Sequence, residues 1–255
     1  MSGLTQLLRR VTGGRWPRRR AMRDGRPHFD CWEQLGIAPG VTADTSQSRA
    51  ADELHIDQFR AAPCYLNRLD HLHHALELAP ADGYILEFGV YRGGSLNWLA
   101  RWAEQRRQPR VFGFDSFEGL PEAWVRTKSG ESYARGHFAL ERLPAVLPNA
   151  LLVPGFFDAT LPGWRAAHAG PVALLHNDSD LYCSTIDTLT QLNDRIVPGT
   201  IIVFDELCDW RNSGVYDAWE EGEWRALREW MAAHDRRIAV LSRNQEFAAA
   251  IRVVR

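Results

Sequence analysis

Residues 84–95 read Tyr84-Ile85-Leu86-Glu87-Phe88-Gly89-Val90-Tyr91-Arg92-Gly93-Gly94-Ser95. The apolar run at 84–88 is short and ends at a glycine, which is typical of a buried strand. After the glycine-rich turn, apolar residues recur at helical spacing and predict a helix over residues 95–105. Strand, glycine turn and helix in this order form the first unit of a doubly wound parallel sheet.

The same alternation continues toward the C-terminus. Further strands are predicted at 111–114, 150–153, 172–175 and 200–204, with a helix around 184–195. A last helix is expected at 224–233, followed by strands at 237–241 and 247–254 that could pair as a hairpin with an antiparallel edge strand. We therefore predict an α/β fold with a doubly wound, mostly parallel, seven-stranded sheet.

The N-terminal part of the chain differs from this pattern. Residues 53–79 carry apolar residues at roughly helical spacing, so we expect an N-terminal helical extension of a domain that spans 51–255. Residues 1–28 hold eight arginines and one acid, a charge of +7, whereas the remainder has 22 basic and 31 acidic residues, a charge of −9. We interpret residues 1–50 as a basic arm and linker and do not expect nucleic acid as its partner.

The basic residues and cysteines also exclude some classes of protein. Lys128 is the only lysine, so neither a phosphate-loop NTPase nor a pyridoxal-phosphate enzyme is expected. No signal-type apolar run starts the chain, and no stretch of about 18 apolar residues could span a membrane. The four cysteines show no C-x-x-C spacing, which favours reduced thiols and a cytoplasmic setting.

The glycine turn predicts the kind of ligand. Tyr91 stands where a dinucleotide fingerprint has its middle glycine, which disfavours a dehydrogenase. Glu87, two residues before Gly89, would repel phosphate and suit an amine or a cationic centre. Asp115 ends the next predicted strand and could accept hydrogen bonds from both ribose hydroxyls. Together these residues favour a nucleoside without phosphate.

Four stretches, at 87–95, 114–121, 155–162 and 178–185, resemble in order the signatures of the macrocin O-methyltransferase-like family of class I S-adenosylmethionine-dependent methyltransferases. The resemblance covers about residues 65–210. It implies that Glu87, Gly89 and the segment 93–95 surround the methionine part of the cofactor, that Asp115 holds the ribose, and that 155–158 lies near the adenine. The cofactor-binding residues expected on this basis are Glu87, Gly89, Tyr91, Arg92, Gly93, Gly94, Ser95, Asp115, Ser116, Phe156, Phe157 and Asp158.

Acidic residues follow two neighbouring strands of the predicted sheet. Asp178 comes after the strand at 172–175, and Asp205 and Glu206 come after the strand at 200–204. Neighbouring strand ends lie about 5 Å apart, so the three carboxylates can converge and would repel one another without a cation. Oxygen ligands suit Mg²⁺, which would lower the pKa of an acceptor hydroxyl while a carboxylate takes its proton. We expect Asp178 to be the catalytic base, with His137 as an auxiliary base.

Two departures from the family pattern leave alternatives open. Asp205-Glu206 stands where the family usually has two aspartates, and Asn177 where it usually has an aliphatic residue. A metal-free site with Asp178 or a histidine as base, or a purely structural acid cluster, are the alternatives to a metal site. Trp210 and Trp219 are candidate walls of the acceptor pocket.

The resemblance and the residues together predict O-methylation of a hydroxyl on a sugar or another natural-product small molecule, with S-adenosylmethionine as methyl donor and assistance by Mg²⁺ or another divalent cation. The resemblance also implies a homo-oligomer. The alternatives are a metal-independent N- or carboxyl-methyltransferase and a non-catalytic nucleoside-binding partner protein that docks through its arginine-rich arm.

Overall fold

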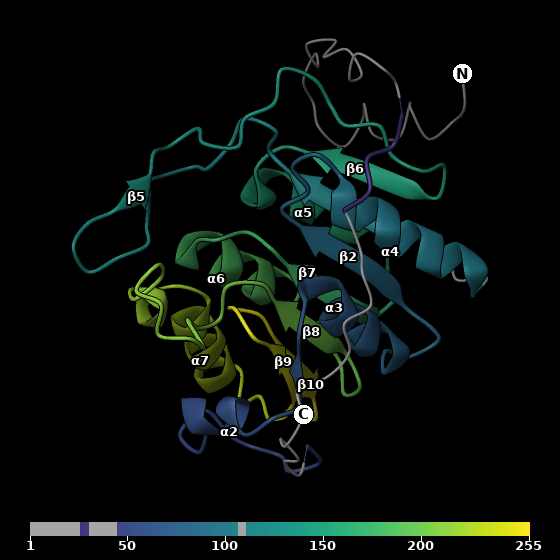
Figure 1. Cartoon of the computed structure of the whole chain (residues 1–255). Coiled ribbons are helices and arrows are strands. Elements are labelled where there is room, and N and C mark those ends of the chain that lie inside the picture. The colour runs from purple at the N-terminus through teal and green to yellow at the C-terminus, as the bar shows by residue number, and fades with distance from the viewer. Residues whose placement is uncertain (1–25, 31–44, 107–110) are drawn as a thin grey trace.

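The computed structural model describes residues 26–30, 45–106 and 111–255. Its centre is an eight-stranded sheet with the strand order β1-β9-β10-β8-β7-β2-β3-β6 (Figure 1). All neighbouring strands pair in parallel except β10, which is antiparallel to β8 and β9. The strands are β1 (Cys64–Tyr65), β2 (Tyr84–Phe88), β3 (Val111–Asp115), β6 (Ala150–Pro154), β7 (Val172–Asn177), β8 (Ile201–Phe204), β9 (Ile238–Asn244) and β10 (Ala249–Val253).

Helices cover both faces of this sheet, and each face has its own apolar core. Residues of α5, α6 and α7 pack with Phe59 of α2 on one face, whereas residues of α3 and α4 pack on the other. The helices are α2 (Ile56–Arg60), α3 (Arg68–Glu77), α4 (Gly94–Gln105), α5 (Phe157–Ala167), α6 (Tyr182–Gln191) and α7 (Glu223–Ala233). The predicted fold class is therefore confirmed.

The segment predicted as a helical extension is built differently. Residues 53–79 are not one helical unit, because the strand β1 separates α2 from α3 and adds an eighth strand to the predicted seven. Pro63 precedes β1 and disfavours helical backbone at the residue before it. Both residues of β1 are buried, and Arg243 of β9 donates its backbone N–H to the Pro63 carbonyl at 2.9 Å. Periodicity alone could not reveal this pairing, since its partner strand lies about 180 residues away.

The two C-terminal strands form the expected antiparallel pair, but β10 lies inside the sheet rather than at its edge. A second, two-stranded sheet consists of β4 (Trp124–Val125) and β5 (Ser132–Tyr133), in the long excursion between β3 and β6 (Figure 1). This hairpin is docked on the segment after β8, because the Trp124 and Tyr216 rings lie 5.5 Å apart and Ala218 donates its N–H to the Arg126 carbonyl at 3.1 Å. It thereby forms an outer wall beside the carboxyl ends of the strands.

Within the described residues, no helix combines the length and the apolar character needed to cross a membrane.

Candidate active site

A cavity of about 740 Å³ lies at the carboxyl ends of β2, β3, β7 and β8. Ligands bind at this edge in doubly wound sheets because the strand ends and the following helix starts leave a crevice there. The wall is formed by the turns after these strands, the first turns of α5 and α6, and the β4–β5 hairpin. The lining residues are Arg68, Gly89, Tyr91, Asp115, Ser116, Gly119, Leu120, Pro121, Trp124, Arg126, Tyr133, Arg135, Phe138, Phe156, Phe157, Asp158, Asp178, Ser179, Asp180, Cys183, Ser184, Asp187, Asp205 and Glu206.

Gly89 joins the turn after β2 to the turn after β7. Its φ of +88° suits glycine, and a Cβ atom there would lie 1.7 Å from the carbonyl oxygen of Asp178. Asp178 in turn donates its N–H to the Phe88 carbonyl at 2.8 Å. The glycine therefore allows the turn after β2 and the turn after β7 to pack backbone against backbone.

Asp115 shapes the same turn. Its Oδ2 accepts hydrogen bonds from the backbone N–H groups of Val90 and Tyr91, both at 2.8 Å, and its Oδ1 accepts one from Phe117 at 2.6 Å. Burial raises the pKa of Asp115 above its usual value, and these three hydrogen bonds oppose the rise. A carboxylate oxygen can accept two hydrogen bonds, so Oδ2 is occupied by Val90 and Tyr91, whereas Oδ1 can hold Phe117 and still accept one hydrogen bond from a ligand in the cavity.

The residues predicted to bind the cofactor divide into two groups. Seven line the cavity, namely Gly89, Tyr91, Asp115, Ser116, Phe156, Phe157 and Asp158, whereas Glu87, Arg92, Gly93, Gly94 and Ser95 do not. Asp30 covers the start of α4, because a Cβ atom on Gly94 would lie 1.8 Å from its Oδ1. The Arg92 guanidinium lies 5.0 Å from the centre of the Tyr91 ring.

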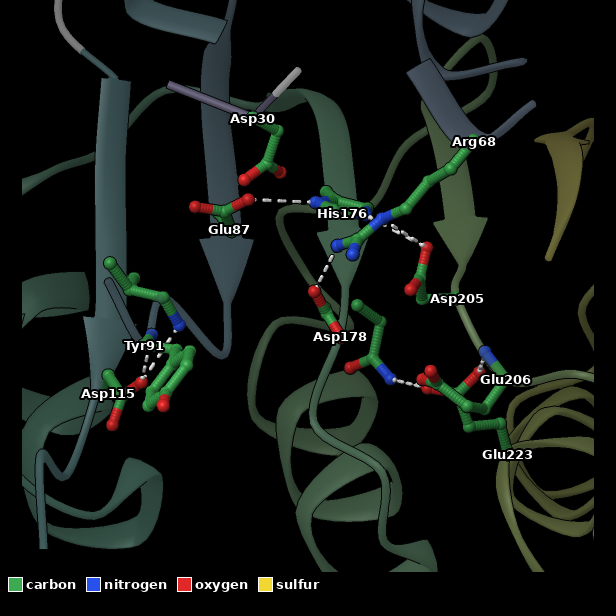
Figure 2. Close-up of polar contacts among 12 residues, drawn as sticks. Asp30, Arg68, Glu87, Tyr91, Asp115, His176, Asp178, Asp205, Glu206 and Glu223 are labelled. Atoms are coloured by element: carbon green, nitrogen blue, oxygen red, sulfur yellow. Dashed lines mark hydrogen bonds and ion pairs between the residues drawn. The ribbon is translucent and has the colours of Figure 1, made fainter. Parts of the chain in front are cut away.

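Asp178, Asp205 and Glu206 lie together as the strand order predicts (Figure 2). One oxygen from each carboxylate lies within 4.8 Å of the other two. Asp178 follows β7, and the other two follow β8, the neighbouring parallel strand. The cluster therefore stands on two adjacent strand ends.

Arg68 lies between two of these carboxylates, and sequence reasoning missed it. Its Nη2 pairs with Asp178 Oδ2, and its Nε lies 3.0 Å from Asp205 Oδ1 (Figure 2). Arg68 is the first residue of α3, after the helix cap Asn67. The local sequence carries no signal for this role, because the side chain meets residues that follow 110 positions or more later.

The cluster remains short of positive charge despite Arg68. Burial raises the pKa of Asp178 to about 6 in spite of the guanidinium beside it. Burial and the neighbouring Asp205 carboxylate raise the pKa of Glu206 well above its usual range. Among the described residues Glu206 Oε2 is buried without a hydrogen-bond donor, whereas Asp205 Oδ1 has Arg68 as an ion-pair partner. Three oxygen donors with unmatched charge suit a hard divalent cation such as Mg²⁺.

A buried imidazole connects Glu87 to Asp205. His176 Nδ1 lies 2.9 Å from Glu87 Oε1, its Nε2 lies 3.6 Å from Asp205 Oδ1, and the His176 and Glu87 side chains are completely buried. Burial disfavours the imidazolium, yet the hydrogen bonds and charges of Asp205 and Glu87 raise the pKa of His176 to about 10. His176 is therefore a cation between two carboxylates, and Glu87 has its partner inside the protein.

Asn177 and Glu223 explain one departure from the family pattern. The Asn177 amide donates hydrogen bonds to Glu223 Oε1 at 2.5 Å and to Thr185 at 2.9 Å, and Glu223 Oε2 accepts the backbone N–H of Glu206 at 2.9 Å. Both Asn177 and Glu223 are fully buried. An aliphatic side chain at position 177 would leave this network without its donor, so the two polar residues form one unit that positions Glu206.

The remaining predicted residues lie elsewhere. His137 is exposed, stacks on the Tyr133 ring at 4.4 Å and does not line the cavity. Trp210 stacks on Phe59 at 6.3 Å, and neither it nor Trp219 contributes to the cavity wall. The tryptophan that lines the cavity is Trp124, on the hairpin.

The profile of the family described as Macrocin-O-methyltransferase (TylF) matches residues 64–231, which is 168 of the 255 residues. This chain belongs to the macrocin O-methyltransferase family. The match includes the glycine turn, Arg68 and all three clustered acids.

This macrocin O-methyltransferase family member is similar in sequence to two O-methyltransferases over part of their length. It is 33% identical over 160 residues to 8-demethyl-8-(2,3-dimethoxy-alpha-L-rhamnosyl)-tetracenomycin-C 4'-O-methyltransferase of Streptomyces olivaceus, covering 55% of this chain and 60% of that protein. It is 30% identical over 166 residues to mycinamicin III 3''-O-methyltransferase of Micromonospora griseorubida, covering 56% and 63%. The chain thus spans less than two thirds of the length of either relative.

The fold is also that of a solved methyltransferase. The crystal structure of CalS11, a calicheamicin methyltransferase, superposes with a TM-score of 0.55 and 24% identity, covering 72% of this chain and 80% of that one. At this identity the likeness shows a shared fold.

Proposed function

We propose that this protein transfers a methyl group from S-adenosylmethionine to a hydroxyl of a sugar or another natural-product small molecule, assisted by Mg²⁺. The observation that carries this proposal is the shared cavity, where the glycine turn with Asp115 adjoins the cluster of Asp178, Asp205 and Glu206. Two relatives support the reaction type, since their names describe 4'-O- and 3''-O-methyl transfer.

The cavity offers each part of the methyl donor a suitable surface. Asp115 Oδ1 would accept a hydrogen bond from a ribose hydroxyl, and the segment 156–158 at the start of α5 would contact the adenine. The acids at the strand ends would stabilise the cationic sulfonium and amine. Because Asp30 covers Gly94, we place the methionine part beside Gly89 and Tyr91 rather than over Gly93–Ser95.

Asp178, Asp205 and Glu206 would hold the Mg²⁺ ion, which when bound lowers the pKa of the acceptor hydroxyl. Asp178 would also accept the hydroxyl proton, because its carboxylate lies in the cavity beside the other two acids, where the acceptor oxygen would be held. The oxygen would then attack the methyl carbon in line with the sulfonium, forming the C–O bond as the C–S bond breaks. Arg68 would keep Asp178 and Asp205 in place during this step.

Calorimetry with S-adenosylmethionine and with its demethylated product tests the cofactor assignment. We expect both to bind, and Asp178→Asn to abolish turnover while product binding remains. Failure of both ligands to bind would refute the methyltransferase proposal. Full activity after exhaustive chelation would favour a metal-independent N- or carboxyl-methyltransferase instead, and binding without turnover on any acceptor would favour the nucleoside-binding partner protein.

The proposal extends to the domain boundary, the oligomeric state and the cellular location of the protein. We infer a methyltransferase domain over residues 51–255 with residues 1–50 as a basic arm and linker, most of which lies outside the described residues. We further infer a cytoplasmic homo-oligomer, supported by the family resemblance and by the free thiols of Cys64, Cys183 and Cys208. Limited proteolysis tests the domain boundary, and light scattering of the full chain tests the assembly.

A further inference from the structure

The β4–β5 hairpin and its flanks give the cavity an aromatic wall, whereas the strand ends give it an acidic edge. Trp124, Tyr133 and Phe138 line the cavity from the hairpin and its flanks. The Phe138 ring lies 5.5 Å from that of Tyr91 in the glycine turn, and Trp124 packs on Tyr216 after β8. The hairpin is thus fastened at both sides of the cavity, and its aromatic faces are placed to pack against the acceptor.

Two arginines on this wall form no ion pair with a carboxylate among the described residues, although the charge of Arg126 opposes the rise in the pKa of Asp180 that burial causes. Arg126 donates from Nη1 to the Tyr133 hydroxyl at 3.3 Å, and its Nε is buried without a hydrogen-bond partner in the described part of the chain. Arg135 is exposed at the cavity rim. Of the three arginines that line the cavity, Arg68 forms ion pairs with carboxylates, whereas Arg126 and Arg135 form none with the residues that the structure describes.

The Arg126 guanidinium is held in place by its own neighbours. Its Cζ lies 5.1 Å from the Trp124 ring centre and 5.3 Å from that of Tyr133. An arginine fixed by two aromatic rings loses little further freedom on binding, and its planar fork suits the oxygens of a phosphate or carboxylate. A partly buried guanidinium with a free donor is costly until a ligand supplies the acceptor.

We propose that the methyl acceptor carries an anionic phosphate or carboxylate group, which Arg126 and Arg135 bind while its hydroxyl reaches Asp178. This inference rests on the proposed methyl transfer and names the acceptor class for the same cavity. The cationic donor and Mg²⁺ would offset the acids at the strand ends, so the hairpin arginines remain as the positive surface for the acceptor. A sugar ring between the two ends would pack on Trp124 or Tyr133.

Binding of hexose probes to the protein saturated with S-adenosylhomocysteine, in EDTA, tests the proposal without turnover. The probes are methyl glucoside, glucuronic acid, glucose 1-phosphate and UDP-glucose. We expect the anionic probes to bind at least 10-fold more tightly than methyl glucoside, with an affinity that falls as salt rises. Comparison of the affinity for glucuronic acid with the affinities for glucose 1-phosphate and UDP-glucose shows whether a carboxylate or a phosphate is the recognised group.

Variants assign the effect to the two arginines. Arg126→Gln and Arg135→Gln should each weaken the preferred anionic probe about 10-fold or more, since a charge-assisted hydrogen bond contributes roughly that factor. Arg126→Lys should restore part of the affinity. Arg211→Gln is the matched control, because Arg211 is exposed and does not line the cavity.

Equal binding of neutral and anionic probes, or an unchanged preference in both glutamine variants, would overturn the proposal. Either result is separate from failure of the proposed function, because binding of S-adenosylhomocysteine is measured first and independently. An anion preference that survives both substitutions would place anion recognition elsewhere in the cavity and would likewise refute the role of the hairpin.

Discussion

Removing the charge of His176 should destabilise the protein strongly. In His176→Gln the Glu87 carboxylate loses its cationic partner at 2.9 Å while both positions remain fully buried. Removing one member of a buried ion pair costs roughly 3–5 kcal/mol, because the other charge remains uncompensated. Glu87→Gln should be milder, since the imidazolium keeps Asp205 as a neighbour at 3.6 Å. The double variant Glu87→Gln/His176→Gln should recover part of the loss, because two amides can form a neutral hydrogen bond.

The charge of His176 also gives this stabilisation a pH dependence with a definite sign. Its pKa is about 10 in the folded protein and about 6.5 in an unfolded chain. The contribution is therefore complete below pH 6.5 and is lost as pH rises toward 10. At 1.36 kcal/mol per unit of pKa shift, the upper limit is about 5 kcal/mol.

Urea denaturation followed by tryptophan fluorescence, at several pH values between 6 and 10, measures both effects. The double variant is the reference, because it lacks the titrating pair, and wild type should lose its advantage over it as pH rises. A cost below about 1 kcal/mol for His176→Gln at pH 7 would refute the buried ion pair. So would a difference between wild type and double variant that stays constant from pH 7 to 10.

Three further substitutions test the rest of the site. Gly89→Ala should lower the free energy of unfolding by at least about 1–3 kcal/mol, because alanine disfavours the positive φ at this position. The clash of its Cβ atom with the Asp178 carbonyl should also weaken S-adenosylhomocysteine binding, whereas an unchanged melting temperature would contradict the close packing. Arg68→Gln should move the acidic limb of the pH profile of kcat to higher pH, because the guanidinium lowers the pKa of Asp178. An acidic limb at the wild-type position would show that Asp178 is not the titrating base. Asn177→Leu should lower the free energy of unfolding by about 1–3 kcal/mol, because Glu223 loses its hydrogen-bond donor. It should also weaken Mn²⁺ binding measured by electron paramagnetic resonance. Mn²⁺ affinity equal to that of wild type would argue against a positioning role.

Much of the fold and one part of the site could be predicted because they depend on local patterns. Short apolar strands that alternate with amphipathic helices already specify a doubly wound sheet, and the carboxyl ends of its parallel strands meet at one edge. Asp178 and Asp205 each follow a strand directly and Glu206 is the next residue, so their convergence needed only the strand order. Gly89 and Asp115 were recognisable for the same reason, since each closes a strand in the sequence.

The rest depends on contacts between distant segments. Whether the segment that holds Arg68 forms one helix or a helix, a strand and a second helix is decided by β9, far along the chain. The ion pairs of Arg68 and the imidazolium between Glu87 and Asp205 exist only once β2, β7, β8 and α3 are packed together. The sequence alone determined which strand ends carry the chemistry, because strand ends are local. Tertiary structure decided how their charges are balanced, because counter-charges come from any segment that packs within a few ångströms.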